Sequence, residues 1–141
     1  MKFNNHVIIQ IFENDRLAKT IEKKNLVVDV GLNLVRDYIN SGTVHPSLNF
    51  ALGTGVTPPA SADVALETPL WSDVFTKRTV EDCKLTYDYF VSSNMLNGNS
   101  ISEAGLMTTT NKLFARITFE PIAKVATIQI MFSWVVQIQE G

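Results

Sequence analysis

The sequence predicts a mainly β protein, an antiparallel β-sandwich or compact barrel, with one packed α-helix near residues 29–41. Three observations lead to this class. Near the C-terminus, apolar and polar residues alternate over about twice the length of a usual strand. Only residues 29–40 show the spacing of a helical face. Elsewhere, short apolar runs are separated by Gly, Pro and Asn turns, and no tandem repeat indicates a solenoid.

The N-terminal segment is predicted to form a hairpin. His6–Phe12 is a short apolar run, Glu13–Arg16 is polar and turn-like, and Leu17–Val28 resumes the alternation with interspersed charges. Two antiparallel strands joined by a tight turn have this pattern.

Residues Asp29–Asn40 change to a helical period. Apolar residues recur there at intervals of four, three and four, which places them on one face: Val28, Leu32, Val35 and Ile39. Asp29 is placed to cap the first turn, and Gly42 follows the last turn. We therefore expect this face to pack on a sheet.

The middle of the chain is predicted as strand, loop and strand. His45–Leu52 is a short strand. Gly53–Pro69 is a surface loop, because Pro58-Pro59 prevents regular pairing, with a short helical turn at Ala62–Leu66. Trp71–Val80 is a strand of irregular alternation.

Four more strands are predicted in the C-terminal half. Lys84–Val91 alternates cleanly, and Asn97-Gly98 suits a tight turn. Ser100–Met107 and Lys112–Glu120 follow, and the long final strand covers Val125–Gln139. This last strand is long and free of turns, which leaves two interpretations open: its edge pairs with a neighbouring chain, or the strand stays inside its own sheet.

The final strand defines the predicted core. One of its faces carries Ile128, Ile130, Phe132, Trp134, Val136 and Ile138. The other carries Gln129, Ser133, Gln137 and Gln139, interrupted by Met131 and Val135. Together with the helix residues, the predicted core comprises Leu32, Val35, Ile39, Leu85, Tyr87, Leu113, Ile117, Phe119, Ile128, Ile130, Phe132, Trp134 and Val136.

Size and charge fit a single domain spanning residues 1–141. The net charge of −2 is spread without blocks, so no basic face for nucleic acid is expected. No apolar stretch is long enough to cross a membrane, and no cleavable signal peptide is expected. The charged fraction of 18% is below the usual quarter, which fits either a surface buried against partners or a weakly charged monomer.

The residues that could bind a phosphate or a metal each have a simpler interpretation. Gly53-Thr54-Gly55 lacks the Gly-Lys-Ser/Thr ending of a phosphate loop, so a glycine turn after a strand is favoured. His6 and His45 have no partners at metal-ligand spacing. The single cysteine, Cys83, excludes an intrachain disulfide, and its acidic neighbours disfavour a thiolate nucleophile. We expect no metal and no cofactor.

Two further groups of residues have both a functional and a structural interpretation. The carboxylates Glu81, Asp82, Asp88 and Glu103 could act in pairs in a glycosidase, but they are interpreted as solvated charges on strand faces. The aromatic residues could stack on single-stranded nucleic acid, but without a basic groove they are interpreted as core: Trp71, Tyr87, Tyr89, Phe114 and Trp134. We expect no enzyme activity.

Three blocks of sequence resemble small structural proteins of tailed bacteriophages. They are KKNLVVDVGLNLVRDYINSG (residues 23–42), FALGTGVTPPASADVALETPLW (residues 50–71), and NGNSISEAGLM with LFARITFEPIAKVATIQIMFSWVVQI (residues 97–107 and 113–138). Their order and spacing resemble short virion proteins related to tail-fibre and tail-collar N-terminal domains, over roughly residues 20–138.

The resemblance implies a non-enzymatic virion structural protein, a tail, collar or fibre-attachment component that assembles by protein–protein contacts. Its partners would be copies of itself, as a trimer or a higher symmetry, and other virion proteins, with no nucleic acid or membrane. It would be made in the host bacterial cytoplasm and reside in the virion. Tail-fibre relatives continue into a shaft or receptor-binding tip, whereas this sequence ends at Gly141, so we do not expect this chain to bind the host receptor.

Two surfaces are predicted to form the contacts. A Pro-rich loop is preorganised, which lowers the cost of ordering on binding, although such a loop can also simply cap a sandwich. The predicted interface residues are Gly53, Thr54, Gly55, Pro58 and Pro59 in the loop, and Gln129, Met131, Gln137 and Gln139 on the last strand.

Three alternatives remain open. A capsid decoration (cement) protein, bound to the major capsid protein lattice, would differ from a tail component in copy number. A virion carbohydrate-binding module or glycan hydrolase would carry an aromatic-lined groove with paired carboxylates. A cytosolic β-domain of the host would be absent from particles.

Overall fold

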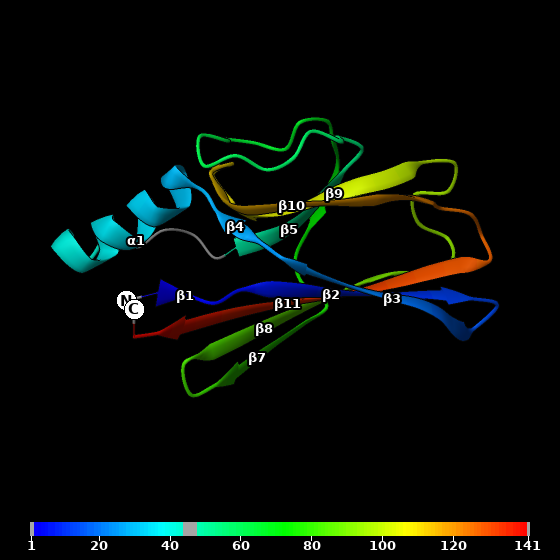
Figure 1. Ribbon diagram of the computed structural model, residues 1–141, viewed down its shortest axis with the longest axis horizontal. Coiled ribbons are helices and arrows are strands. Elements are labelled where there is room, and N and C mark those ends of the chain that lie inside the picture. The colour runs from blue at the N-terminus through cyan, green and yellow to red at the C-terminus, as the bar shows by residue number, and fades with distance from the viewer. Residues whose placement is uncertain (1, 44–47, 141) are drawn as a thin grey trace. The chain divides into compact units, whose positions relative to one another are not determined.

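The computed structural model describes residues 2–43 and 48–140 and contains eleven strands and one helix among them (Figure 1). In chain order these are β1 Lys2–Phe3, β2 His6–Glu13, β3 Arg16–Lys24, β4 Leu26–Val27, α1 Asp29–Ser41, β5 Leu48–Gly53, β6 Pro69–Asp73, β7 Lys77–Glu81, β8 Lys84–Val91, β9 Ser100–Thr108, β10 Leu113–Ala123 and β11 Ile128–Gln139. The predicted mainly β class is confirmed, because two antiparallel sheets and a single helix are the content of a β-sandwich. The helix is too short to cross a membrane.

The strands belong to two compact units, each built from separate stretches of the chain. The first unit comprises residues 1–25, 75–100 and 122–141, and the second comprises residues 26–74 and 101–121. The sheet of the first unit has the order β3-β2-β11-β8-β7, with β1 also pairing with β11. The sheet of the second unit has the order β4-β10-β9-β5-β6. The single domain expected over residues 1–141 stays a prediction.

The N-terminal hairpin is confirmed as β2 and β3. Its turn contains Asn14 and Asp15, whose φ angles of 49° and 65° lie in the left-handed region that Asn and Asp tolerate. The hairpin places β2 against β11 in the first unit.

The strand β11 lies inside its sheet, and the interpretation in which its edge pairs with a neighbouring chain is wrong. It pairs with β2 over residues 128–135 and with β8 over residues 130–137. Near its C-terminal end, Ile138 and Gln139 pair with the short strand β1. The strand is long because these partners are staggered along it.

The burial of β11 follows its sequence alternation in the middle and departs from it at the ends. Ile130, Phe132, Trp134 and Val136 are buried. Ile128 is half-buried, and Ile138 is exposed where the strand leaves the sheet. Among the other residues of the predicted core, Tyr87, Leu113, Ile117 and Phe119 are buried, while Leu85 is half-buried.

The predicted helix is confirmed as α1. It follows Val28 and ends before Gly42, whose φ of 68° allows its amide to donate to the Tyr38 carbonyl at 2.8 Å. Asp29 makes no side-chain cap hydrogen bond, but its charge in the first turn is favourable to the helix dipole.

The face of α1 that packs on the second sheet differs from the predicted face. Gly31 and Leu34 are buried. Leu32 and Ile39, predicted as core, are exposed. Gly31 lies so close to the backbone of Phe114 in β10 that a Cβ atom would overlap it. The side of the helix that carries Gly31 therefore packs on the sheet. The predicted apolar face, with Leu32 and Ile39, points away from this contact.

Replacing Gly31 by alanine should destabilise the protein. In an exposed helix interior this change gains up to about 1 kcal/mol, but here the added Cβ meets backbone atoms of Phe114. Overpacking of this kind costs typically about 1–3 kcal/mol. Denaturant unfolding of Gly31→Ala beside Asn33→Ala, an exposed position on the same helix, measures the difference. A stabilised Gly31→Ala protein would contradict the close approach.

The segment predicted as one strand from Trp71 to Val80 is two strands in different sheets. β6 ends at Asp73, and β7 begins at Lys77. The chain passes from the second unit to the first between Val74 and Phe75, which explains the irregular alternation. The helical turn predicted at residues 62–66 is not formed, and residues 44–47, with His45, lie outside the described residues.

Candidate functional site

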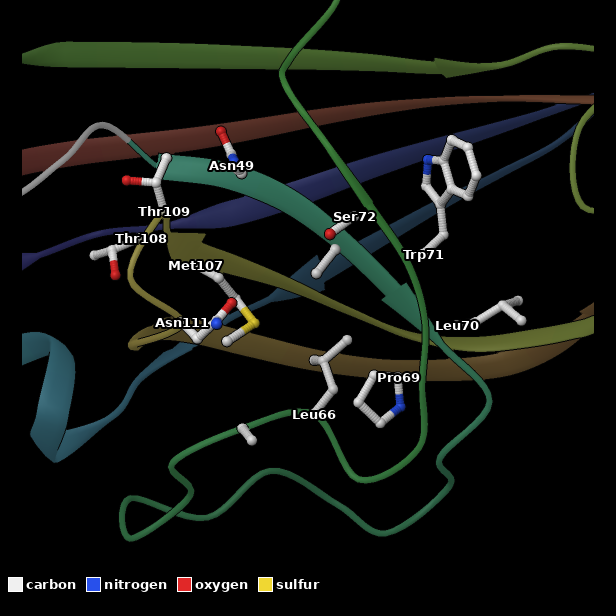
Figure 2. Close-up of a pocket in the computed structure, with 12 residues that line it drawn as sticks. Asn49, Leu66, Pro69, Leu70, Trp71, Ser72, Met107, Thr108, Thr109 and Asn111 are labelled. Atoms are coloured by element: carbon white, nitrogen blue, oxygen red, sulfur yellow. The ribbon is translucent and has the colours of Figure 1, made fainter.

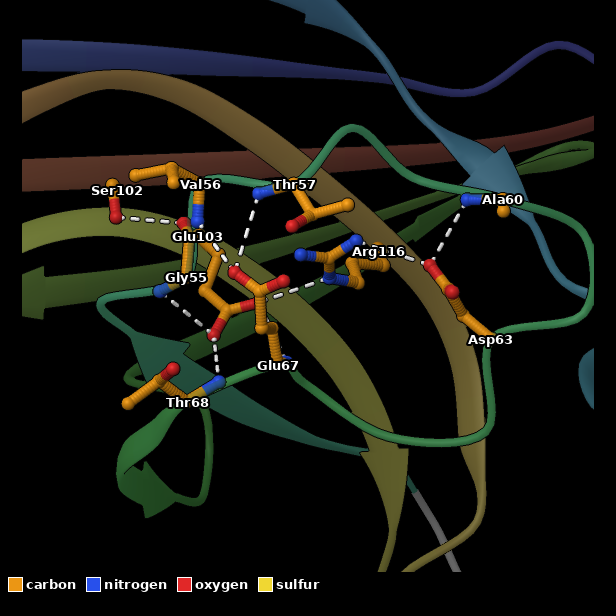
Figure 3. A network of polar contacts seen from close by, with 10 residues as sticks. All are labelled: Gly55, Val56, Thr57, Ala60, Asp63, Glu67, Thr68, Ser102, Glu103 and Arg116. Carbon is orange, nitrogen blue, oxygen red and sulfur yellow. Dashed lines mark hydrogen bonds and ion pairs between the residues drawn. The ribbon is translucent and has the colours of Figure 1, made fainter.

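The loop that joins β5 to β6 is held in one conformation by buried charged groups. Residues 54–68 contain no strand or helix, as expected from their prolines. The amide of Thr54 donates to the carbonyl of Thr68 at 3.0 Å and closes the base of the loop. Figure 3 shows side chains from β9 and β10 reaching into this loop.

Glu103 of β9 is the centre of the network. Its side chain is fully buried, and each of its oxygens accepts two hydrogen bonds. Oε1 accepts from the amides of Gly55 at 3.1 Å and Thr68 at 2.7 Å. Oε2 accepts from the amide of Glu67 at 3.0 Å and from Nε of Arg116 at 2.9 Å. The carboxylate thus supplies the acceptors that the loop backbone needs in place of a strand partner.

Arg116 of β10 neutralises Glu103 and extends the network. It is 2% exposed, and its Nη1 donates to Oδ2 of Asp63 at 3.0 Å. The same oxygen of Asp63 accepts from the amide of Ala60 at 2.9 Å. One guanidinium therefore links the strand carboxylate to the far end of the loop. A charge this deeply buried is tolerated because it is paired.

The predicted interface residues Gly53 and Gly55 are buried inside the site. A Cβ atom on Gly53 would overlap the Glu103 carboxylate and the Thr68 carbonyl, and one on Gly55 would overlap Glu67 and Glu103. The hydroxyl of Ser102 also donates to the Gly55 carbonyl at 2.7 Å. These glycines are needed for close approach to the network, and they present no surface to a partner.

The exposed side chain of Glu67 accepts hydrogen bonds that stabilise the outer part of the loop. Its Oε1 accepts from the amides of Val56 at 2.9 Å and Thr57 at 3.2 Å. The Thr57 hydroxyl, these two amides and the positive charge of Arg116 together lower the pKa of Glu67. The ionised carboxylate is the form that holds the loop.

Acid should therefore loosen the loop. The pKa of Glu67 is lowered from 4.5 on folding, so its contribution to stability is present above about pH 4.5 and is lost as the pH falls through the lowered value. We expect the stability of Glu67→Gln to vary less with pH than that of the wild type in this range. Thr57→Val should remove part of the same dependence. Urea unfolding across the acidic range measures it, and identical pH profiles for wild type and Glu67→Gln would contradict this role.

A cavity of about 550 Å³ lies beside the loop in the second unit (Figure 2). Leu66 and Met107 supply apolar lining, and Asn49, Ser72 and Asn111 supply neutral polar groups. Within the described part of the chain, no charged residue lines it. Trp71 contributes to the rim, but Figure 2 shows its ring on the other side of β6 from Leu66. Its lining residues, so far as the structure describes them, include no pair of carboxylates of the kind a glycan hydrolase uses.

A second polar cluster, in the first unit, surrounds Lys124. This side chain is buried and donates to Oδ1 of Asn97 at 2.7 Å and to the carbonyls of Val125 at 3.1 Å and Ser93 at 3.4 Å. All three acceptors are neutral, and burial lowers the pKa of Lys124. The lysine thereby ties the turn predicted at Asn97-Gly98 to the segment before β11.

The predicted interface residues of β11 are placed unevenly. Gln129 is half-buried, and its Nε2 donates to the Ser93 hydroxyl at 3.1 Å within the same unit. Met131 and Gln137 are half-buried, and Gln139 is exposed. In the loop, Pro58 is exposed, while Thr54 and Pro59 are half-buried.

The cysteine, the remaining carboxylates and the described histidine do not come together in one site. Cys83 is exposed in the turn between β7 and β8, beside exposed Glu81 and Asp82. His6 is half-buried in β2. Among residues 2–43 and 48–140, no group of three or more His, Cys, Asp or Glu side chains could hold a metal ion.

The sequence interpretation of Glu103 as a solvated surface charge is wrong. Its role was missed because its partners come from distant blocks of the sequence. The available signal was a charge within each of two apolar runs, Ile101–Met107 and Leu113–Phe119.

Comparison with family models, curated proteins and solved structures finds no significant match to this chain.

Proposed function

We propose that this chain is a non-enzymatic structural protein of a tailed-bacteriophage virion, a tail, collar or fibre-attachment component that assembles by protein–protein contacts. One observation carries the proposal. The three blocks of the phage resemblance meet at the loop network: Gly55 and Asp63 come from the second block, and Glu103 and Arg116 from the third. The first block joins them through the amide of Asp29, which donates to the Ser61 carbonyl at 2.8 Å.

This convergence favours a binding role over a catalytic one. Both oxygens of Glu103 are occupied by protein donors, so the carboxylate has no open position for a substrate proton. What the network produces is a fixed loop. Val56 and Val64 are exposed on it, at 67% and 63%. A preorganised loop with exposed apolar side chains binds a partner at a low entropy cost.

The test is the content of purified particles. In particles of the phage that encodes this chain, quantitative mass spectrometry should detect it at a fixed copy number. Tens of copies or fewer fit a tail component, and hundreds would fit the capsid decoration protein instead. Absence from particles would overturn the proposal, and binding on a glycan array by a chain absent from particles would support the carbohydrate-binding alternative.

A loop variant tests the surface itself. Val56→Asp with Val64→Asp should lower incorporation into particles by roughly tenfold or more while the protein remains folded. Val80→Asp is the matched control, because Val80 is 69% exposed on β7 in the other unit. Equal incorporation of the loop variant and the control would show that another surface makes the contact.

A further inference from the structure

Two asparagine side chains place buried polar atoms without partners at one end of the first sheet. Asn5, between β1 and β2, is 5% exposed, and Asn25 directly follows β3. Nδ2 of Asn5 and both polar side-chain atoms of Asn25 are buried and form no hydrogen bond with the described residues. A buried polar group without a partner is costly in free energy, so these three atoms require an explanation.

The register of the N-terminal hairpin brings the two side chains together. β2 and β3 pair His6 with Lys24, and the same register continues to Asn5 opposite Asn25. In agreement, the amide of Asn25 donates to the Asn5 carbonyl at 3.4 Å. Residues directly opposite each other in an antiparallel pair point to the same face, with their Cβ atoms about 5 Å apart. The three atoms therefore form one cluster.

A hydrogen bond to β11 fixes the orientation of the Asn5 carboxamide. Its Oδ1 accepts from the backbone amide of Gln137 at 3.0 Å. Only the oxygen of a carboxamide can accept from an N–H group, so this bond identifies the other atom as the NH2 group. That NH2 group is a donor that needs an acceptor. The Asn25 carboxamide adds one acceptor and one donor, whichever way round it is oriented.

The chemistry of this cluster matches water. All three atoms belong to neutral carboxamides, which favours a neutral ligand over an ion, and their burial requires a small one. Water donates and accepts at once, and buried waters typically bond polar groups that the protein leaves unsatisfied. We propose that Asn5 and Asn25 form a buried hydration site, in which one water accepts from Nδ2 of Asn5 and donates to Oδ1 of Asn25. A second water accepts from Nδ2 of Asn25.

This hydration site connects three strands where regular pairing stops. β3 ends at Lys24, and the chain enters the second unit directly after Asn25. Asn5 lies in the break between β1 and β2 and is bonded to β11 through Gln137. The bridging water therefore joins the end of the hairpin to the central strand of its sheet. The site is separate from the proposed role in assembly and does not depend on it.

Nuclear Overhauser contacts between water and the side-chain amides test the proposal in the full chain. For the Nδ2 protons of Asn5 and Asn25, these contacts should have opposite signs in the laboratory and rotating frames, which distinguishes bound water from proton exchange. Asn33, exposed on α1, is the control and should show no contact of this kind. Absence of bound water at Nδ2 of Asn5 would overturn the proposal, and a direct contact between the two carboxamides would replace it.

Replacing Asn25 by leucine gives a second test through the sign of the stability change. Leucine has nearly the same shape as asparagine but carries no polar side-chain atom. If water is bound, Asn25→Leu removes its acceptor and leaves Nδ2 of Asn5 without a partner, so the urea midpoint should fall. If the site is dry, the change removes two unsatisfied atoms and the midpoint should rise. Asn33→Leu should leave it nearly unchanged. A raised midpoint for Asn25→Leu would overturn the proposal.

Discussion

Replacing Glu103 by glutamine is expected to lower the free energy of unfolding by about 3–5 kcal/mol, the cost of leaving a buried charge without its partner. The variant keeps the size of the side chain but turns one acceptor oxygen into an NH2 group. That group would face hydrogen-bond donors, because Glu103 accepts from three loop amides and from Arg116. Arg116 would lose this ion pair and keep the one with Asp63.

Urea unfolding monitored by tryptophan fluorescence measures this loss. Glu81→Gln is the matched control, since Glu81 is exposed on β7 and its replacement should change stability by less than about 0.5 kcal/mol. A loss of under about 1 kcal/mol for Glu103→Gln would mean that the network contributes little to the fold.

Truncation of Trp134 to alanine should cost about 3–5 kcal/mol. The residue is fully buried in the central strand β11, between Val7 of β2 and Tyr87 of β8. Alanine would leave a cavity that these neighbours, held in register on both sides, could fill only in part. The cost therefore combines the lost burial of the ring with the cavity itself.

The control for Trp134 lies on the same strand. Gln139 is exposed at its end, and Gln139→Ala should change stability by less than about 0.5 kcal/mol. Thermal or urea unfolding of the two variants gives the comparison. Similar losses at both positions would contradict the assignment of the strand's buried face.

The sequence was informative wherever one strand or helix has one clear periodicity. The alternation in β11 predicted which side chains are buried in its middle, and the glycine after α1 predicted the end of the helix. It failed for the strand order, because alternation describes the two faces of a strand and says nothing about its edges. The interior position of β11 depends on β1 and β2, which lie near the N-terminus, and on β8, which lies more than thirty residues before β11.

The helix shows why apolar periodicity can mislead. The most apolar stripe of α1 contains Leu32 and Ile39, yet Gly31 decides which side meets the sheet. A glycine contributes no hydrophobicity to the pattern, but it allows the closest approach to the backbone of Phe114. Contact distance therefore decided which side of the helix docks, and the apolar stripe remains partly exposed.

The candidate site was predictable only in part. The prolines and glycines of the loop indicated a preorganised surface segment, and that segment is where the network lies. The hydrogen bonds that hold this segment could not be predicted, because Arg116 reaches Glu103 only when β9 and β10 lie side by side, and it then links Glu103 to Asp63 of the loop. Each charge taken alone resembles an ordinary polar residue on a strand.

Amide hydrogen exchange in the loop tests the central claim, that a buried carboxylate holds this segment rigid. The amides of Gly55, Glu67 and Thr68 belong to no strand or helix, yet they donate to Glu103 and should exchange as slowly as amides within the sheet. In Glu103→Gln the same amides should exchange much faster, while those of β11 remain protected. Rapid exchange of these three amides in the wild-type protein would contradict the account.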